Sequence, residues 1–204
     1  MIQKIIYDLT YMPKGHTGHL CPTDSVVNAW KDFHLRCAFT NVLEFGFNTG
    51  WSSALLLTMF PHVRITSIEI ADIERARMGA DILAQKFSGR HDTVWGNSQK
   101  VAEDVMQGRR SLPGTAYDLS FIDGGHWPEV VQKDIELSLH LGIKNFVFDD
   151  GNHPNIKPGI GKFPQLKFIK ENFYWDTKYK SEGYQFKYKN GKQRKVDLCY
   201  YQVS

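Results

Sequence analysis

The stretch that decides the fold is Asn41-Val-Leu-Glu-Phe-Gly-Phe-Asn-Thr-Gly50. Its apolar first half predicts a buried strand over residues 41–46, and the apolar run after it predicts a helix over residues 51–60. Gly46 and Gly50 permit a tight turn between the two and a close approach of the backbone to a bound molecule. The first turn of the helix offers free backbone N–H groups. Taken alone, the pattern also fits an ordinary turn from a strand into a helix.

Outward from this stretch, short apolar runs alternate with amphipathic ones. Further strands are expected over residues 63–69, 92–95, 117–123 and 145–150, and helices over residues 71–87, over residues 98–107 and from Pro128 onward. Strands that alternate with helices of this length imply right-handed crossovers and a parallel sheet covered on both faces. The fold class is therefore expected to be α/β, with a Rossmann-like, doubly wound, mostly parallel sheet.

The two ends of the chain add to this core. An accessory helix is expected over about residues 23–38, with Thr23 as its N-cap. After Pro164 we expect a helix to about residue 172, followed by strands over residues 184–189 and 196–203. Asn190-Gly191 between these strands is a strong hairpin signal. The prediction is one domain, residues 1–204, whose seven-stranded sheet ends in an antiparallel C-terminal hairpin.

Composition and charge narrow the class of protein. The chain has 204 residues, of which 42% are hydrophobic and 23% charged, and no apolar run reaches the length of about 20 residues that a membrane helix needs. The first residues do not read as a secretion signal, and three widely spaced cysteines form no metal or redox motif. We therefore expect a cytoplasmic protein with reduced thiols and no membrane association.

The C-terminal end is basic. Residues 162–204 hold ten Lys and Arg against four Asp and Glu, whereas the rest of the chain holds 15 against 18. Such an end can attract an anionic partner such as a nucleic acid. The same lysines would also protect an exposed edge hairpin from aggregation.

The second predicted strand ends in Ile68-Glu69-Ile70. An acidic side chain at this point, a little over 20 residues after the glycine loop, can accept hydrogen bonds from both hydroxyls of a ribose. Alone, Glu69 would also fit a helix cap or a solvated charge. Its pairing with Gly46 and Gly50 favours the ribose.

Glu-x-Gly-x-x-x-Gly, followed by an acidic residue at the second strand end, resembles the first two motifs of class I S-adenosylmethionine-dependent methyltransferases. A nicotinamide-binding loop would more often carry glycine where this chain has Asn48. The resemblance spans about residues 40–150 and implies that the methionine half lies on the loop, the ribose on Glu69 and the base near Trp95-Gly-Asn-Ser98. The cofactor-binding residues that it implies are Glu44, Gly46, Asn48, Gly50, Ser52, Glu69, Asn97, Ser98 and Asp123.

Carboxylates follow the next two strands. The fourth strand ends in Phe121-Ile-Asp123-Gly-Gly-His126, and the fifth in Phe148-Asp149-Asp150-Gly-Asn-His153. Neighbouring strand ends lie about 5 Å apart, so these carboxylates should crowd and raise one another's pKa. A hard divalent cation would offset the charge, and oxygen ligands suit magnesium better than zinc. Alternatively, Asp123 only hydrogen-bonds the cofactor and Asp149 caps a loop.

Asp-Gly-Gly-His also resembles a methyltransferase subgroup that includes cephalosporin hydroxylase-like and macrolide sugar O-methyltransferase-like proteins. Metal-dependent O-methyltransferases, including the catechol type, are similar at both strand ends, which implies that Asp123, Asp149 and Asp150 bind Mg²⁺. Catechol-type enzymes carry a Lys three positions after the first Asp, where this chain has His126. We therefore expect Asp123 and His126 as catalytic residues, with His126 as the general base, because an imidazole suits proton removal at neutral pH. A structural role for His126 stays open, and His153 is a second candidate.

The function that these residues predict is methyl transfer from S-adenosylmethionine to a hydroxyl oxygen of a small molecule. The alternatives are methylation of nitrogen or of a macromolecule, another reaction on the same scaffold, and a non-catalytic cofactor-binding protein. A nucleic-acid partner is less favoured, because the chain lacks the Asn/Asp-Pro-Pro-Tyr/Phe motif of base-methylating enzymes. The N-terminal segment with Trp30 and Phe33 could pack a second subunit in a homodimer or its own sheet.

Overall fold

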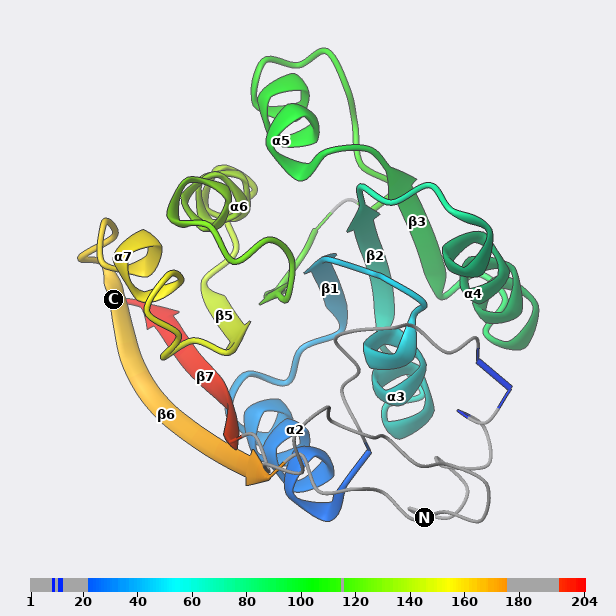
Figure 1. Cartoon of the computed structure of the whole chain (residues 1–204), viewed down its shortest axis with the longest axis horizontal. Coiled ribbons are helices and arrows are strands. Elements are labelled where there is room, and N and C mark those ends of the chain that lie inside the picture. The colour runs from blue at the N-terminus through cyan, green and yellow to red at the C-terminus, as the bar shows by residue number, and fades with distance from the viewer. Residues whose placement is uncertain (1–8, 10, 13–21, 115, 176–194) are drawn as a thin grey trace, which may run out of the picture.

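The structure, a computed structural model, describes residues 9, 11–12, 22–114, 116–175 and 195–204. Its centre is a seven-stranded sheet with strand order β3-β2-β1-β4-β5-β7-β6 (Figure 1). The strands are β1 (Asn41–Phe45), β2 (Arg64–Glu69), β3 (His91–Trp95), β4 (Leu119–Ile122), β5 (Asn145–Asp149), β6 (Leu166–Trp175) and β7 (Lys195–Val203). Strands β1 to β5 run parallel, and β7 is antiparallel to both β5 and β6. The expected Rossmann-like, mostly parallel sheet is confirmed.

Helices cover both faces of this sheet (Figure 1). They are α2 (Asp24–Cys37), α3 (Trp51–Met59), α4 (Glu74–Lys86), α5 (Ser98–Met106), α6 (Pro128–His140) and α7 (Lys157–Ile160). Side chains alternate between the faces along each strand, so Val42 of β1 packs with α2 and α3, and Leu43 packs with α5 and α6. The carboxyl ends of β1 to β5 are left at one common edge.

The N-terminal helix packs on the chain's own sheet. The Thr23 hydroxyl accepts a hydrogen bond from the Val26 N–H at 3.4 Å, which confirms the expected N-cap. Trp30 and Phe33 are fully buried, and the Trp30 ring lies 5.0 Å from the ring of Phe121 on β4. Helix α2 thus fills one face of the core beside α3.

The prediction of a helix after Pro164 is wrong, because residues 166–175 form strand β6. Its backbone pairs with β7 along most of its length, with a bulge between Phe168 and Lys170. This pairing with a distant segment outweighs a local pattern that suits a helix about as well. The strand expected over residues 184–189 and the Asn190-Gly191 turn lie outside the described residues, so the antiparallel pair that closes the sheet is β6 with β7.

The other helices and strands begin and end close to the residues predicted from the sequence. Helix α4 begins at Glu74, three residues after its expected start, and β7 covers the strand expected at the C-terminal end. Cys37 and Cys199 both carry free thiols. In the described part of the chain, no helix has the length and apolar character needed to cross a membrane.

Candidate functional site

The loop between β1 and α3 has an unusual backbone. Gly46, Asn48 and Gly50 have φ angles of 92°, 51° and 83°, in the left-handed region that favours glycine. A Cβ atom on Gly46 would lie 2.8 Å from the Asp123 carbonyl carbon. The loop therefore packs directly on the chain that leaves β4, and only glycine fits at this contact.

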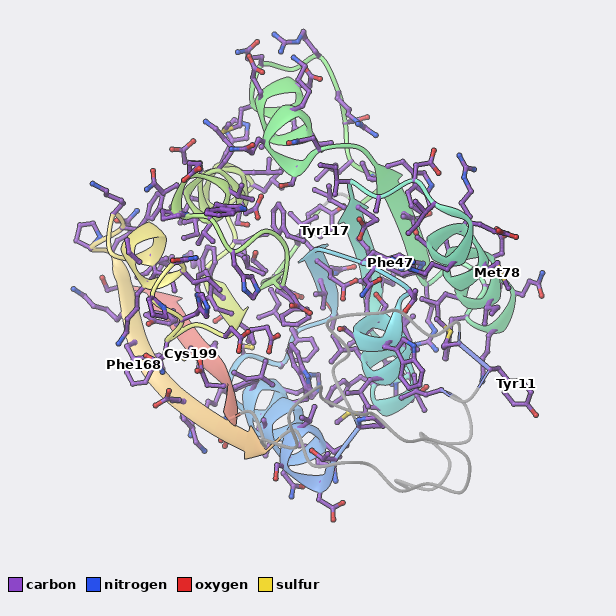
Figure 2. The ribbon with its side chains drawn as sticks, in the orientation of Figure 1. Tyr11, Phe47, Met78, Tyr117, Phe168 and Cys199 are labelled. Atoms are coloured by element: carbon purple, nitrogen blue, oxygen red, sulfur yellow. The ribbon has the colours of Figure 1, made fainter. Side chains whose placement is uncertain are left out.

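The opposite side of the same loop rests on α4. A Cβ atom on Gly79 of that helix would lie 2.9 Å from the Thr49 carbonyl carbon. The Gly50 N–H donates to the Phe47 carbonyl at 2.8 Å, which closes the turn before α3. The Phe47 ring, labelled in Figure 2, packs on the His91 imidazole with ring centres 5.1 Å apart. The loop is thus held from both sides.

Glu69 ends β2 and is buried against this loop. One carboxylate oxygen accepts the N–H groups of Phe47 and Asn48 at 2.8 and 2.5 Å, and the other accepts the Ala71 N–H at 2.6 Å. A carboxylate accepts about four hydrogen bonds, so among the described residues one acceptor position remains on the second oxygen. Glu69 therefore shapes the glycine loop, and its role toward a ribose stays a prediction.

Glu44 is the last residue but one of β1, just before the loop. The side chain is 1% exposed, and its Oε2 accepts the hydroxyls of Ser53 and Ser67, each at 2.5 Å. Ser67 Oγ also lies 3.1 Å from His91 Nε2. Burial raises the pKa of Glu44 to about 7, although the two hydroxyls lower it. The structure places Glu44 as a support inside the sheet, below the loop residues it was predicted to accompany.

The other predicted cofactor residues lie at neighbouring strand ends. Ser52 is buried in the first turn of α3. Asn97 caps α5, where its side-chain oxygen accepts the N–H groups of Gln99 and Lys100 at 2.9 and 3.4 Å, and Ser98 is the first residue of that helix. The Gly96 N–H donates to the Glu69 carbonyl at 2.8 Å, so this cap sits beside β2.

Asp123 and Asp149 meet at the ends of adjacent strands β4 and β5. Their carboxyl groups are in hydrogen-bonding contact. Burial, and then the charge of Asp149, raise the pKa of Asp123 well above its usual range, and Glu44 and Asp150 raise it further. Two carboxyls in contact must share a proton or a cation. The expected crowding is confirmed for these residues.

The turn after β5 brings two histidines together. Asp150 has a left-handed φ of 54°, and its carbonyl accepts the His153 N–H at 2.7 Å. The rings of His126 and His153 face each other with centres 5.4 Å apart and planes at 50°. The two candidate bases therefore lie side by side, although 26 residues separate them in the chain.

A further polar cluster was missed by sequence reasoning. Possible ligand atoms of Glu171, Asp197 and Cys199 lie within 4.8 Å of one another, and Figure 2 labels Cys199 on β7. The Asn152 N–H donates to Asp197 Oδ1 at 3.0 Å, and the Asn152 amide contacts Glu171. Glu171 was expected on a helix, which would have kept it away from β7. Only the spacing Asp197-x-Cys199, which puts both on one face of a strand, hinted at the cluster.

Asp134 on α6 was missed as well. Its carboxyl is fully buried, and within the described residues neither oxygen has a hydrogen bond of normal geometry. Burial raises its pKa to about 8, and the nearby Ser98 hydroxyl only partly offsets this. A Cβ atom on Gly124 would lie 3.8 Å from Asp134 Oδ2, so the acid sits under the turn that follows Asp123. The sequence pattern that could have indicated its burial is its spacing from Val131 and Ser138, which places all three residues on one face of the helix.

Solved structures with a similar fold share little sequence with this chain. An O-methyltransferase from Bacillus cereus, solved in complex with SAH, has a TM-score of 0.58 and 13% identity, covering 98% of this chain and 90% of its own. A proposed caffeoyl-CoA O-methyltransferase from Staphylococcus aureus has a TM-score of 0.59 and 15% identity, and the match covers 98% of this chain and 91% of that protein. A proposed RNA methyltransferase from Pyrococcus horikoshii has a TM-score of 0.62 and 11% identity, and the match covers 99% of this chain and 97% of that protein. These likenesses establish the fold.

A comparison with curated protein sequences finds no match. The sequence profile of the family described as "Methyltransferase domain" matches residues 43–151, which is more than half of the chain and contains the glycine loop, Glu69 and the carboxylates. The chain therefore belongs to this methyltransferase-domain family and is an S-adenosylmethionine-dependent methyltransferase.

Proposed function

We propose that this enzyme methylates a hydroxyl oxygen of a small molecule, with Mg²⁺ held by Asp123, Asp149 and Asp150. The observation that carries the proposal is the contact between the Asp123 and Asp149 carboxyls, next to the loop that contains Gly46. Oxygen ligands of this kind match the preference of magnesium.

The residues at the other strand ends fit the cofactor. The loop from Gly46 to Gly50 would hold the methionine half together with Ser52, and Glu69 would accept a hydrogen bond from the ribose. Asn97 and Ser98 would lie beside the base. Three adjacent strands, β1 to β3, present these groups at their carboxyl ends, where ligands bind in open α/β sheets. The relative from Bacillus cereus was solved with SAH, the product that remains after methyl transfer.

The carboxylate cluster fits the cation. Asp123 and Asp149 share a proton when nothing else compensates their charge, and the same two carboxylates would hold a divalent cation in place of that proton. When bound, the cation supplies positive charge that lowers the pKa of an acceptor hydroxyl.

The protein's contribution to the reaction is mainly orientation. The loop at Gly46 and Gly50 would hold the methionine half of the cofactor in a fixed orientation toward the acceptor oxygen. The S–CH₃ bond breaks as the O–CH₃ bond forms, which leaves SAH and the methyl ether. The hydroxyl proton passes to His126 or to water, and both histidine rings border this end of β4 and β5.

Calorimetric titration with S-adenosylmethionine, with Mg²⁺ and then with chelator, tests the proposal. Mn²⁺ binding, followed by electron paramagnetic resonance, tests the cation site directly. Asp149→Ala should lose Mn²⁺ binding and keep the affinity for S-adenosylmethionine within about twofold. Asp81→Ala, on an exposed part of α4, is the matched control and should change neither quantity.

The outcomes separate the parts of the proposal. If S-adenosylmethionine binds and Mn²⁺ does not, the proposed cation site is wrong and the enzyme is a metal-free methyltransferase. If Asp149→Ala binds Mn²⁺ with unchanged affinity, the cation is held by other ligands than those assigned. If S-adenosylmethionine fails to bind in every condition, the whole assignment of the site is wrong.

A further inference from the structure

The carboxylate of Glu69, at the end of β2, is bonded to three backbone N–H groups. Its Oε2 accepts the N–H groups of Phe47 and Asn48 at 2.8 and 2.5 Å, and its Oε1 accepts the N–H of Ala71 at 2.6 Å. The residue is buried. One buried carboxylate therefore joins the glycine loop after β1 to the turn after β2.

The acceptor capacity of this carboxylate is nearly used. A carboxylate offers about four acceptor positions, which is two on each oxygen. The two loop N–H groups fill both positions on Oε2, and the Ala71 N–H fills one of the two on Oε1. Among the described residues no other group donates a hydrogen bond to Glu69, so one position on Oε1 is left for a ligand.

The loop cannot easily release its two bonds to Oε2. It is packed from both sides, because a Cβ atom on Gly46 would lie 2.8 Å from the Asp123 carbonyl carbon and one on Gly79 would lie 2.9 Å from the Thr49 carbonyl carbon. Phe47 is 3% exposed, so its N–H would not gain a water molecule in place of the carboxylate. Since an unpaired buried N–H is unfavourable, Glu69 keeps its loop partners when a ligand binds.

A ribose presents two adjacent hydroxyls. For one carboxylate to bind both, each hydroxyl donates to a different oxygen or both donate to the same one. The first arrangement needs a free position on Oε2, and the second needs two on Oε1. The sequence pattern around Glu69 suits both hydroxyls, but the backbone bonds leave a position for one.

We propose that Glu69 binds only one of the two ribose hydroxyls of the cofactor, because backbone N–H groups occupy its other three acceptor positions. This inference rests on the ribose position in the proposed function. Glu69 then has two roles, since it fixes the glycine loop and also recognises one hydroxyl. It discriminates against a cofactor that lacks this hydroxyl and does not discriminate against one that lacks the other.

Calorimetric titration of the full chain with SAH and with its 2′-deoxy and 3′-deoxy forms tests this recognition. Wild-type enzyme should bind one deoxy form about 10- to 100-fold more weakly than SAH, because a hydrogen bond to a charged group is lost. If neither deoxy form loses affinity, Glu69 recognises no hydroxyl and the proposal is wrong.

Glu69→Gln separates the carboxylate from any other group near the ribose. In this variant the affinity ratio of SAH to one deoxy form should fall at least about fivefold, and the ratio to the other form should stay within about twofold. Any effect of the variant on the loop is common to the three ligands and cancels in these ratios. Asp72→Asn, in the same turn and with an exposed side chain paired to Arg77, is the control and should change neither ratio.

Hydrogen exchange tests the filled acceptor positions without a ligand, and it does so even if Glu69→Gln does not fold. The amide protons of Phe47 and Asn48 should be protected in the wild-type enzyme, and the protection should persist when SAH is bound. Rapid exchange of both amide protons would mean that the loop does not fill Oε2, which overturns the proposal.

The proposal and the proposed function fail in different ways. If both ratios fall together in Glu69→Gln, the ribose lies at Glu69 but both hydroxyls bind there, so only the single-hydroxyl proposal is wrong. If SAH does not bind to the wild-type enzyme, the assignment of the cofactor site is wrong and this proposal fails with it.

Discussion

Replacement of Asp134 by Asn should change how the stability of this enzyme depends on pH. The carboxyl is fully buried in α6, and its pKa is raised from 3.8 to about 8. Each pKa unit corresponds to about 1.4 kcal/mol, so at pH 7 the need to keep this group protonated lowers the free energy of unfolding by about 4 kcal/mol. This free energy is relative to a carboxyl that ionises freely in the unfolded chain.

The sign of the pH dependence follows from proton binding. Between about pH 4 and pH 8 the folded state holds a proton on Asp134 that the unfolded state has released. The contribution of this group to the free energy of unfolding therefore falls as pH rises through this window and levels off above the folded pKa. Asn has nearly the same shape and does not titrate, so Asp134→Asn loses this slope.

The expected result is a difference between variant and wild type that grows with pH. Relative to wild type, Asp134→Asn should gain about 4 kcal/mol between pH 4 and pH 7, measured by urea unfolding at a series of pH values. An unpaired amide subtracts a constant of about 1–3 kcal/mol, which shifts the curve without changing its slope. Asp81→Asn, on an exposed part of α4, controls for loss of a carboxylate. A constant difference across the pH range would refute the reasoning, because Asp134 would then titrate as an ordinary carboxyl.

Three further substitutions test the loop, its support and the accessory helix. Gly46→Ala puts a methyl group against the Asp123 backbone and should weaken S-adenosylmethionine binding at least tenfold by calorimetry, whereas Gly89→Ala, with no neighbour within 4 Å, should leave it unchanged. Glu44→Ala removes the carboxylate that accepts two buried hydroxyls and should lower the free energy of unfolding by about 3 kcal/mol. A loss near zero would mean that this carboxylate does not stabilise the sheet. Thr23→Ala should cost about 1 kcal/mol in thermal unfolding and leave cofactor affinity intact, and a change in affinity would contradict a purely structural cap.

The central part of the fold could be predicted because local signals suffice for it. Apolar runs such as residues 41–45 are buried on both faces of the sheet, and Gly46 marks the start of the crossover that follows this run. Strand β6 could not be predicted in this way. Lys167-Phe168-Ile169 suits a helix or a strand, and its choice depends on β7, which lies about 30 residues further along the chain.

The site shows the same division between local and distant causes. Contact between Asp123 and Asp149 follows from the rule that parallel strands end at one edge. Contact between His126 and His153 requires the left-handed turn at Asp150, and a non-glycine residue in that conformation leaves no clear mark in the sequence. Asp134 was hidden because a charged residue on an amphipathic helix is usually exposed.

The two glycine contacts of the β1–α3 loop bear on how the cofactor arrives. Because Gly46 touches the end of β4 and Gly79 touches Thr49, the loop has little freedom to rearrange on its own. Its conformational entropy is lost when the chain folds, so little of it remains to be lost when a ligand binds. Encounter with S-adenosylmethionine should then proceed at a rate governed by diffusion and charge, and loop ordering should add no slow phase to the binding kinetics.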